Sequence, residues 1–315
     1  MIHRSCWTAV ILAFALVACS CAAHSSHSNA PQASLSTDDS IFAARIHTAK
    51  ALRYDTLPIG ERIVAMGKLF LGTPYVAGTL DVDPAQENLV VNLHGFDCVT
   101  FYENMLALAR VVREYPTPTR HDFENELTFL RYRNGKRDGF HSRLHYSIDY
   151  FYNNQQKGVL KIVTKEAGGT YAKYDDRAIN FMTTHRTSYK QLAQNDTEYA
   201  AMLEIENDIH ARRAFYYIPK EHVADMEKNI ETGDILGITT NVPGLDCSHT
   251  GIAVRMPKDG RIHFMHASSL MGQVIISPEP LAEYLTHSSH QTGIMVNRPI
   301  EVSIGRVGAR AIHRN

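Results

Sequence analysis

The sequence predicts an α+β fold in which helices come first and antiparallel strands follow. Apolar residues recur at helical spacing before residue 115, whereas short strands separated by turn residues fill the part after residue 230. Of the 315 residues, 44% are hydrophobic and 21% are charged, as in a globular protein with a full core. The formal net charge of −1 gives no indication of nucleic-acid binding.

Two helices are predicted in the first part. The apolar positions of the first helix are Ile59, Ile63, Met66 and Phe70. This helix ends at Gly72, because glycine commonly terminates helices. The second helix begins at Cys98 with Asp97 as its N-cap, and it stops before Pro116.

The region from about 117 to 230 is mixed and polar, and we expect it to be an insertion that shapes one side of a substrate cleft. The strands that follow are predicted at 234–238, 250–255, 261–267, 273–276 and 293–296, with a short helix at 280–285. The segment 257–260 (Pro-Lys-Asp-Gly) carries the turn chemistry of a hairpin.

The N-terminus has the features of an export signal. Basic residues precede a short apolar run, and the run ends in Leu16-Val17-Ala18-Cys19, which resembles a bacterial lipobox. We therefore predict a signal peptide over 1–18, lipidation at Cys19, a flexible tether over 19–40 and a catalytic domain over 41–315.

The alternative is an ordinary secretory signal that is cleaved near Ala22 or Ala23, and both readings predict export. Ser20 follows Cys19, which in a bacterium with two membranes resembles an outer-membrane signal. The expected location is the periplasm, with a lipid anchor in that membrane.

Cys98 stands where a helix begins, and the positive end of a helix dipole lowers the pKa of a thiol. A thiolate is a nucleophile, so Cys98 is a candidate for acyl transfer. The alternative is a buried structural cysteine, because free cysteine is among the most buried residue types.

His249 and His266 lie almost symmetrically about the 257–260 turn. On adjacent antiparallel strands they would lie opposite each other or within a residue or two, so one could act as a base and the other could orient it. Two ordinary strand histidines would show the same spacing.

Two further hypotheses concern the role of Cys247. It could form a disulfide with Cys98 after export, which would remove the nucleophile. On a regular strand it would share a face with His249, which would allow a Cys98–Cys247–His249 metal site. The chain lacks the close paired spacing typical of zinc ligands, so no metal site is predicted.

An ordered series of motifs resembles a known family. The series is GTPYVAG at 72–78, GFDC at 95–98, SHTGIA at 248–253 and HAS at 266–268, together with SRLHY at 142–146. Shorter stretches that match are 180–182, 217–220, 293–296 and 298–299. Together they resemble the NlpC-type papain-like cell-wall cysteine hydrolases, and most closely their N-acetylmuramoyl-L-alanine amidase-like branch.

The resemblance implies a permuted papain-like fold, with the nucleophile helix packed on a small antiparallel β-barrel. It implies Cys98 as nucleophile, His249 as base and His266 as the orienting group. Tyr75 would lie beside the cysteine and support the oxyanion, although a core tyrosine would fit the same position.

Arg143, His145 and Tyr146 are the expected substrate-binding residues, since arginine grips carboxylates and muropeptides carry them. The alternative for this segment is a surface salt bridge beside a packed aromatic.

The implied activity is cleavage of the N-acetylmuramoyl-L-alanine amide in peptidoglycan fragments with an anhydromuramic end, without a cofactor. An endopeptidase of the same fold that cuts γ-D-glutamyl-diamino acid bonds is one alternative. A non-catalytic lipoprotein that binds wall peptides is another. The sequence leaves the oligomeric state open.

Overall fold

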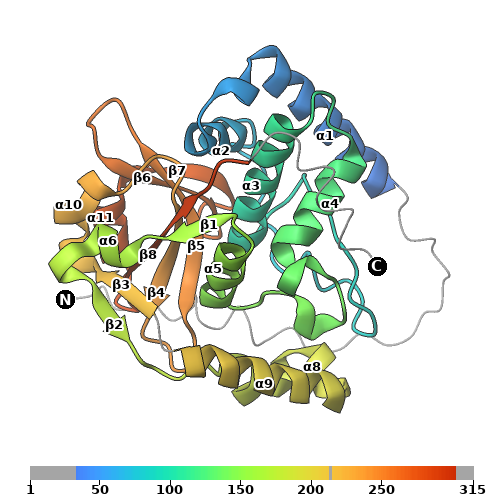
Figure 1. The fold of residues 1–315 in the computed structure, drawn as a ribbon, viewed down its shortest axis with the longest axis vertical. Coiled ribbons are helices and arrows are strands. Elements are labelled where there is room, and N and C mark those ends of the chain that lie inside the picture. Colours follow the sequence, from blue (N-terminus) through green and yellow to red (C-terminus); the bar gives the residue numbers. More distant parts are fainter. Residues whose placement is uncertain (1–32, 213–214, 303–315) are drawn as a thin grey trace, which may run out of the picture.

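The computed structural model describes residues 33–212 and 215–302, and it confirms the predicted α+β class (Figure 1). The predicted signal peptide 1–18, the lipidation site Cys19 and most of the tether lie outside the described residues. Within the described ranges, no helix is both long enough and apolar enough to cross a bilayer.

All strand pairs in the main sheet are antiparallel, and the strand order is β2-β3-β8-β4-β5-β6-β7, with β1 pairing with β8 as well. The strands are β1 (Leu160–Ile162), β2 (Lys173–Asp175), β3 (Phe215–Pro219), β4 (Ile235–Thr240), β5 (Cys247–Arg255), β6 (Ile262–Ser268), β7 (Gln273–Pro280) and β8 (Gln291–Pro299). The predicted hairpin at 257–260 joins β5 to β6, so this prediction is confirmed.

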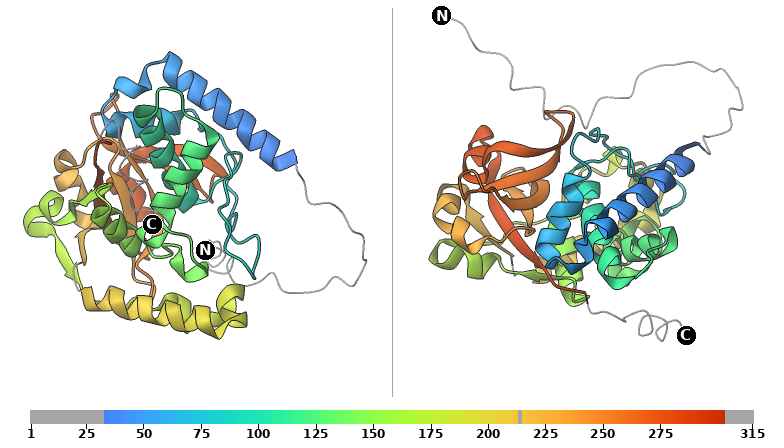
Figure 2. Two further views of the ribbon diagram at one scale, coloured as in Figure 1. Left: turned by 45° about the vertical axis from the view of Figure 1, so that its right-hand side comes forward. Right: turned by 90° about the horizontal axis from the view of Figure 1, so that it is seen from above.

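Helices cover both faces of the sheet (Figures 1 and 2). They are α1 (Ala33–Ala51), α2 (Ile59–Lys68), α3 (Cys98–Glu114), α4 (Arg120–Arg131), α5 (Ser147–Gln156), α6 (Thr164–Gly168), α7 (Phe181–Thr184), α8 (Lys190–Gln194), α9 (Asp196–Arg212), α10 (Val223–Met226) and α11 (Leu281–Tyr284). The larger core lies between the sheet and α2, α3 and α5, and its sheet side includes Ile252, Val254 and Met265.

The second face of the sheet is covered by α6, α10 and α11. Val223 from α10 and Leu281 from α11 pack there against Phe264 and Ile238 of the sheet. In the described residues β2 and β7 end the strand order and do not pair with each other, so the closed barrel that we expected is not formed. Short helices, rather than further strand pairing, bury this face.

The region 117–230 is more than a peripheral insertion. Its strands β1 and β3 pair with β8, so they belong to the central sheet. Its helix α4 packs on α3 through two buried ion pairs, Arg110–Glu126 at 2.6 Å and Arg131–Glu103 at 2.9 Å. Helix α3, which begins at Cys98, is therefore held by residues from this region.

Helix α1 begins at Ala33, inside the range predicted as tether. The tether prediction rested on the abundance of small and polar residues, but Phe42, Ile46 and Ala49 anchor this helix to the core. The Phe42 ring stacks on Phe123 of α4 with centroids 5.5 Å apart. Tertiary packing thus overrides a composition that is weakly helical by itself.

Candidate active site

Cys98 is the first residue of α3, and Asp97 caps this helix as predicted. The Asp97 carboxylate accepts the Thr100 N–H at 2.7 Å, and Thr100 Oγ1 accepts the Asp97 N–H at 2.9 Å. This reciprocal capping box fixes where α3 begins. The sequence therefore places the thiol at the end of the helix that meets the sheet, where α3 contacts β5 and β6.

The thiol of Cys98 is not acidic in this structure, contrary to our expectation. Burial raises the pKa of Cys98 to about 12, and the neighbouring Asp97 carboxylate adds to the rise. The neighbouring hydroxyl and backbone of Thr250 lower the pKa only in part. Desolvation and the charge of the capping carboxylate outweigh the helix dipole at this position.

His249 on β5 and His266 on β6 are in direct contact. His249 Nε2 lies 2.6 Å from His266 Nδ1, and the two rings are nearly perpendicular. In the β5–β6 register Ile252 lies opposite Met265, which puts the two histidines two positions apart as a diagonal pair. The predicted proximity of these side chains is confirmed.

The two histidines are neutral at ordinary pH. Burial lowers the pKa of His249 to about 4, and burial together with the charge of His249 lowers the pKa of His266 to about 2. The Phe264 ring stacks on His266 with centroids 4.6 Å apart. Gly251 makes room for that ring, since a Cβ at this position would lie 2.6 Å from Phe264 Cε2.

The thiol of Cys98 reaches the residue next to His249 rather than His249 itself. Among the described residues, its polar contacts come from Thr250, and no hydrogen bond joins the sulfur to the His249 ring. Because His249 Nε2 faces His266, the ring nitrogen left for the thiol is Nδ1. Catalytic hydrogen bonds are often long in the absence of substrate, so this gap is compatible with a catalytic pair.

Cys247 and His249 do not share a face, contrary to our expectation from strand alternation. The β4–β5 register shifts here, so Ile238 lies opposite His249 whereas Thr239 lies opposite Cys247. This bulge turns Cys247 into the larger core, while His249 packs edge-on against Phe264.

The two cysteines of the folded part are both free thiols, so the structure has no Cys98–Cys247 disulfide. Across residues 33–212 and 215–302, no cluster of three or more His, Cys, Asp or Glu side chains is arranged to hold a metal ion.

Tyr75 lies near the thiol. Its backbone pairs with Gly272 and its neighbours Pro74 and Val76 pair with Phe96, two residues before Cys98. Burial and the charges of Cys98 and Asp97 raise the pKa of Tyr75 to about 12. The phenol therefore stays protonated and can donate a hydrogen bond.

Arg143 is buried and already paired with acidic groups of the segment 81–87. Its Nη2 lies 2.6 Å from the half-exposed Asp81 and its Nε lies 3.3 Å from the buried Glu87. The guanidinium also lies 5.0 Å from the centre of the Phe140 ring. A ligand carboxylate at Arg143 would compete with Asp81.

His145 and Tyr146 bind other parts of the chain. His145 Nε2 lies 2.8 Å from the Phe140 carbonyl, and burial with the charge of Arg143 holds the His145 pKa well below its usual value. The Tyr146 hydroxyl donates to Glu206 at 2.6 Å and accepts the Met182 N–H at 2.8 Å. In the described residues, no hydrogen bond joins these two side chains or Arg143 to Cys98, His249 or His266.

The sequence reasoning missed two residues of this site. Thr250 contacts the thiol, and Tyr284 of α11 packs on His266 with ring centroids 5.3 Å apart. The charge of Cys98 also contributes to a raised pKa of Tyr284. Thr250 adjoins His249 in the SHTGIA stretch, whereas Tyr284 comes from a distant helix that carries no local signal.

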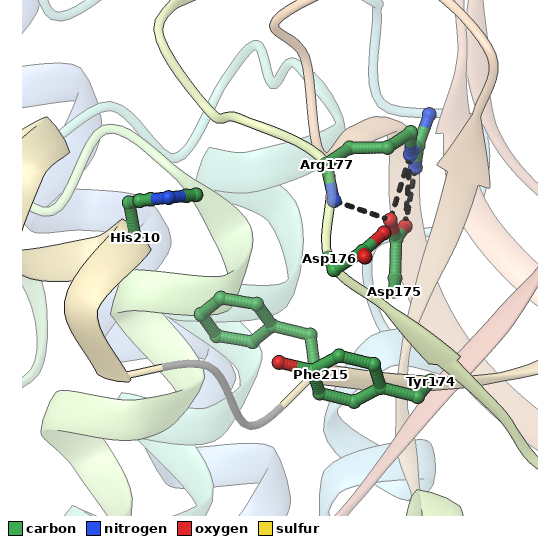
Figure 3. Close-up of a pocket in the computed structure, with 6 residues that line it drawn as sticks. All are labelled: Tyr174, Asp175, Asp176, Arg177, His210 and Phe215. Carbon is green, nitrogen blue, oxygen red and sulfur yellow. Dashed lines mark hydrogen bonds and ion pairs between the residues drawn. The ribbon is translucent and has the colours of Figure 1, made fainter.

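Two open pockets lie outside this site. One has a volume of about 230 Å³, and Figure 3 shows its lining residues: Tyr174, Asp175, Asp176, Arg177, His210 and Phe215. There Arg177 pairs with Asp175 (Figure 3). The other pocket, of about 340 Å³, includes Glu87 and Phe140, the neighbours of Arg143. None of the predicted catalytic residues lines either pocket.

Residues 65–294 match the model of a family described as N-acetylmuramoyl-L-alanine amidase-like. Among solved structures, an N-acetylmuramoyl-L-alanine amidase from Bacteroides uniformis is 36% identical, with a TM-score of 0.69. The alignment covers 77% of this chain and 99% of that protein. No curated protein matches the chain.

Two other solved structures are similar. A protein from Bacteroides fragilis, named as a candidate xylanase, is 37% identical with a TM-score of 0.66, and the match covers 74% of this chain and 98% of that one. A Legionella pneumophila protein is 23% identical with a TM-score of 0.64, covering 86% of this chain and 97% of that one, and shows a shared fold only.

Proposed function

The chain belongs to the N-acetylmuramoyl-L-alanine amidase-like family, and we propose that it is a cysteine amidase of the NlpC-type papain-like class. Its substrates would be peptidoglycan fragments, and it would cut the amide between N-acetylmuramic acid and L-alanine. The observation that supports this most directly is the contact of 2.6 Å between His249 and His266. His249 adjoins Thr250, the residue that lies against the Cys98 thiol. A thiol, a base and a group that orients the base are the parts of an acyl-transfer site.

In this proposal His249 acts as general base while Cys98 attacks. The Cys98 sulfur bonds to the carbonyl carbon of the muramoyl lactyl group as its proton moves to His249 Nδ1. The proton then passes to the amine of L-alanine, which leaves as the C–N bond breaks. Water, deprotonated by His249, attacks the thioester and releases the muramic acid carboxylate, and the thiol regains its proton. No cofactor takes part.

Because the Cys98 thiol and the His249 ring are both neutral before substrate binds, the thiol proton moves only during the reaction. Because the Cys98 pKa is about 12 and the His249 pKa is about 4, a thiolate–imidazolium pair is disfavoured before substrate binds. The transfer therefore accompanies sulfur–carbon bond formation. His266 supports it as a neutral acceptor of the His249 Nε2–H, which holds His249 in the tautomer with a free Nδ1.

The protonated phenol of Tyr75 is proposed as a donor to the oxyanion. Its position beside Cys98 and its raised pKa fit that role, since a donor must keep its proton while negative charge develops nearby. Arg143 remains the proposed contact for a substrate carboxylate, with Asp81 displaced when substrate binds. For His145 and Tyr146 we propose that they shape the segment that carries Arg143, because their polar atoms already have partners.

Xylan hydrolysis is the activity named for one similar protein, but it calls for two carboxyl groups that flank a glycosidic bond. The carboxylate of Asp97, whose charge acts on the thiol, is engaged as a helix cap. The site chemistry of Cys98, His249 and His266 therefore favours acyl transfer for this chain.

The preference for an anhydromuramic end, the lipid anchor at Cys19 and the periplasmic location at the outer membrane are further parts of this proposal, supported by the sequence motifs alone.

Mass analysis of the products from defined anhydro-muropeptides tests the proposed bond. The amidase releases an intact peptide and a free anhydromuramic sugar. A cut inside the peptide would identify a γ-D-glutamyl-diamino acid endopeptidase with the same nucleophile. Unchanged fragments across a broad panel would indicate a binding protein. The soluble form should begin at residue 32 or earlier, because α1 starts at Ala33.

A further inference from the structure

Helix α1 precedes the family match at 65–294, yet it holds the nucleophile helix α3 at both ends. Near its C-terminus, Lys50 Nζ donates to the carbonyls of Val112 and Tyr115 at 2.7 Å each, at the C-terminal end of α3. Near its N-terminus, Asp38 binds the loop 92–97 that leads into Cys98. These two residues are twelve positions apart, roughly 18 Å along a helix, whereas the 17 residues of α3 span roughly 25 Å.

Asp38 is a buried carboxylate with two partners on that loop. It is only 2% exposed. Its Oδ1 accepts the Leu93 N–H at 2.7 Å and lies 2.9 Å from His94 Nδ1. A buried carboxylate is costly unless it is hydrogen-bonded, so these contacts fix the loop against α1.

The opposite side of the same loop is fixed to the segment that carries Tyr75. Phe96 donates to the Pro74 carbonyl at 3.0 Å and accepts the Val76 N–H at 2.9 Å. The loop 92–97 is therefore held by Asp38 at Leu93 and His94, and by the segment around Tyr75 at Phe96. The position of Cys98 relative to Tyr75 and Thr250 depends on both sets of contacts.

We propose that Asp38 is a positioning residue for Cys98, acting through Leu93 and His94. It touches neither thiol nor substrate. Its role is to hold the loop 92–97 so that the sulfur stays beside Thr250 and within reach of His249. The kinetic part of this inference rests on the proposed amidase function, whereas its structural part does not.

The test compares Asp38→Ala with Asp39→Ala in the form that contains all of α1. Asp39 is the matched control, because it adjoins Asp38 but points to an exposed ion pair with Arg120 at 2.7 Å. For Asp38→Ala we expect kcat on the cleaved muropeptide to fall at least about tenfold with KM within about twofold, since small misplacements of reacting groups are costly. Asp38→Asn, which keeps an acceptor for the Leu93 N–H, should restore most of kcat. Asp39→Ala should match wild type.

A second readout uses iodoacetamide at fixed pH, well below the unfolding temperature. A loosened loop exposes Cys98 to water, so its alkylation should become faster in Asp38→Ala while kcat falls. Cys247, buried in the core, is the internal control, because global unfolding would expose both thiols.

Wild-type kcat and wild-type Cys98 alkylation in folded Asp38→Ala would overturn the proposal. Parallel acceleration at Cys98 and Cys247 would also overturn it, since it would show general destabilisation. If wild type cleaves no muropeptide, the amidase function fails, and the ratio of the two alkylation rates still tests Asp38.

Discussion

His249 Nε2 and His266 Nδ1 lie 2.6 Å apart, so one of these two nitrogens carries the proton between them. If His249 is the base for Cys98, its Nε2 must be the donor and His266 Nδ1 the acceptor. The low pKa of His266, about 2, keeps that acceptor free of a proton. The role that we propose for His266 is therefore to fix the tautomer of His249 as a neutral group, without contributing a charge.

Replacing His266 with alanine should lower kcat by about 100-fold, because His249 loses the partner that fixes its tautomer and ring orientation. His266→Gln, whose side-chain carbonyl can accept the same hydrogen bond, should recover part of the loss. His121→Ala, at an exposed position on α4, is the control. Equal losses in the alanine and glutamine variants, both folded, would count against an acceptor role.

The pH dependence of kcat/KM should be flat around neutrality. His249, with a pKa of about 4, is already unprotonated at neutral pH. The Cys98 thiol, with a pKa of about 12, keeps its proton until the pH is far above neutrality. Activity should therefore fall only as the pH drops toward 4. A rising limb between about pH 6 and 8 would instead indicate a titrating group with an ordinary histidine or thiol pKa.

Tyr75→Phe should reduce kcat by about 100-fold with little change in KM, as expected when one oxyanion donor is removed. Its ring packs with the core, so the phenylalanine should fold normally. Tyr171→Phe, at a partly exposed ring stacked on His222, is the matched control. A kcat within about twofold of wild type would assign Tyr75 to the core alone.

Thr250→Val should slow both catalysis and alkylation of Cys98 by about tenfold, because it removes the neighbouring hydroxyl that can donate to negative charge developing on the sulfur. The Thr250 hydroxyl is buried and has no hydrogen-bond partner among the described residues, so valine leaves no other group unpaired. Thr250→Ser should retain near wild-type rates. Unchanged alkylation in the valine variant would show that the hydroxyl does not act on the sulfur.

Local patterns predicted much of the fold. The start of α3 followed from Asp97 and its capping chemistry, and the β5–β6 hairpin followed from the turn at 257–260. That hairpin in turn brought His249 and His266 together. These features depend on neighbouring residues, and the physical signals for them are local.

Features set by distant segments could not be predicted in this way. The bulge in the β4–β5 pairing separated Cys247 from His249, although strand alternation alone would have joined them. The raised pKa of Cys98 reflects burial by the whole fold, which a helix-terminus argument does not include. Tyr284 and Asp38 reach the site region from α11 and α1, far from the motifs in sequence.

Whether Cys98 is the nucleophile is decided by peptide release from a defined anhydro-muropeptide, measured for wild type, Cys98→Ala and Cys247→Ser under reducing conditions. The proposed mechanism predicts release by wild type and by folded Cys247→Ser, and none by Cys98→Ala. Release by Cys98→Ala at the wild-type rate would contradict the assignment of Cys98 as the nucleophile.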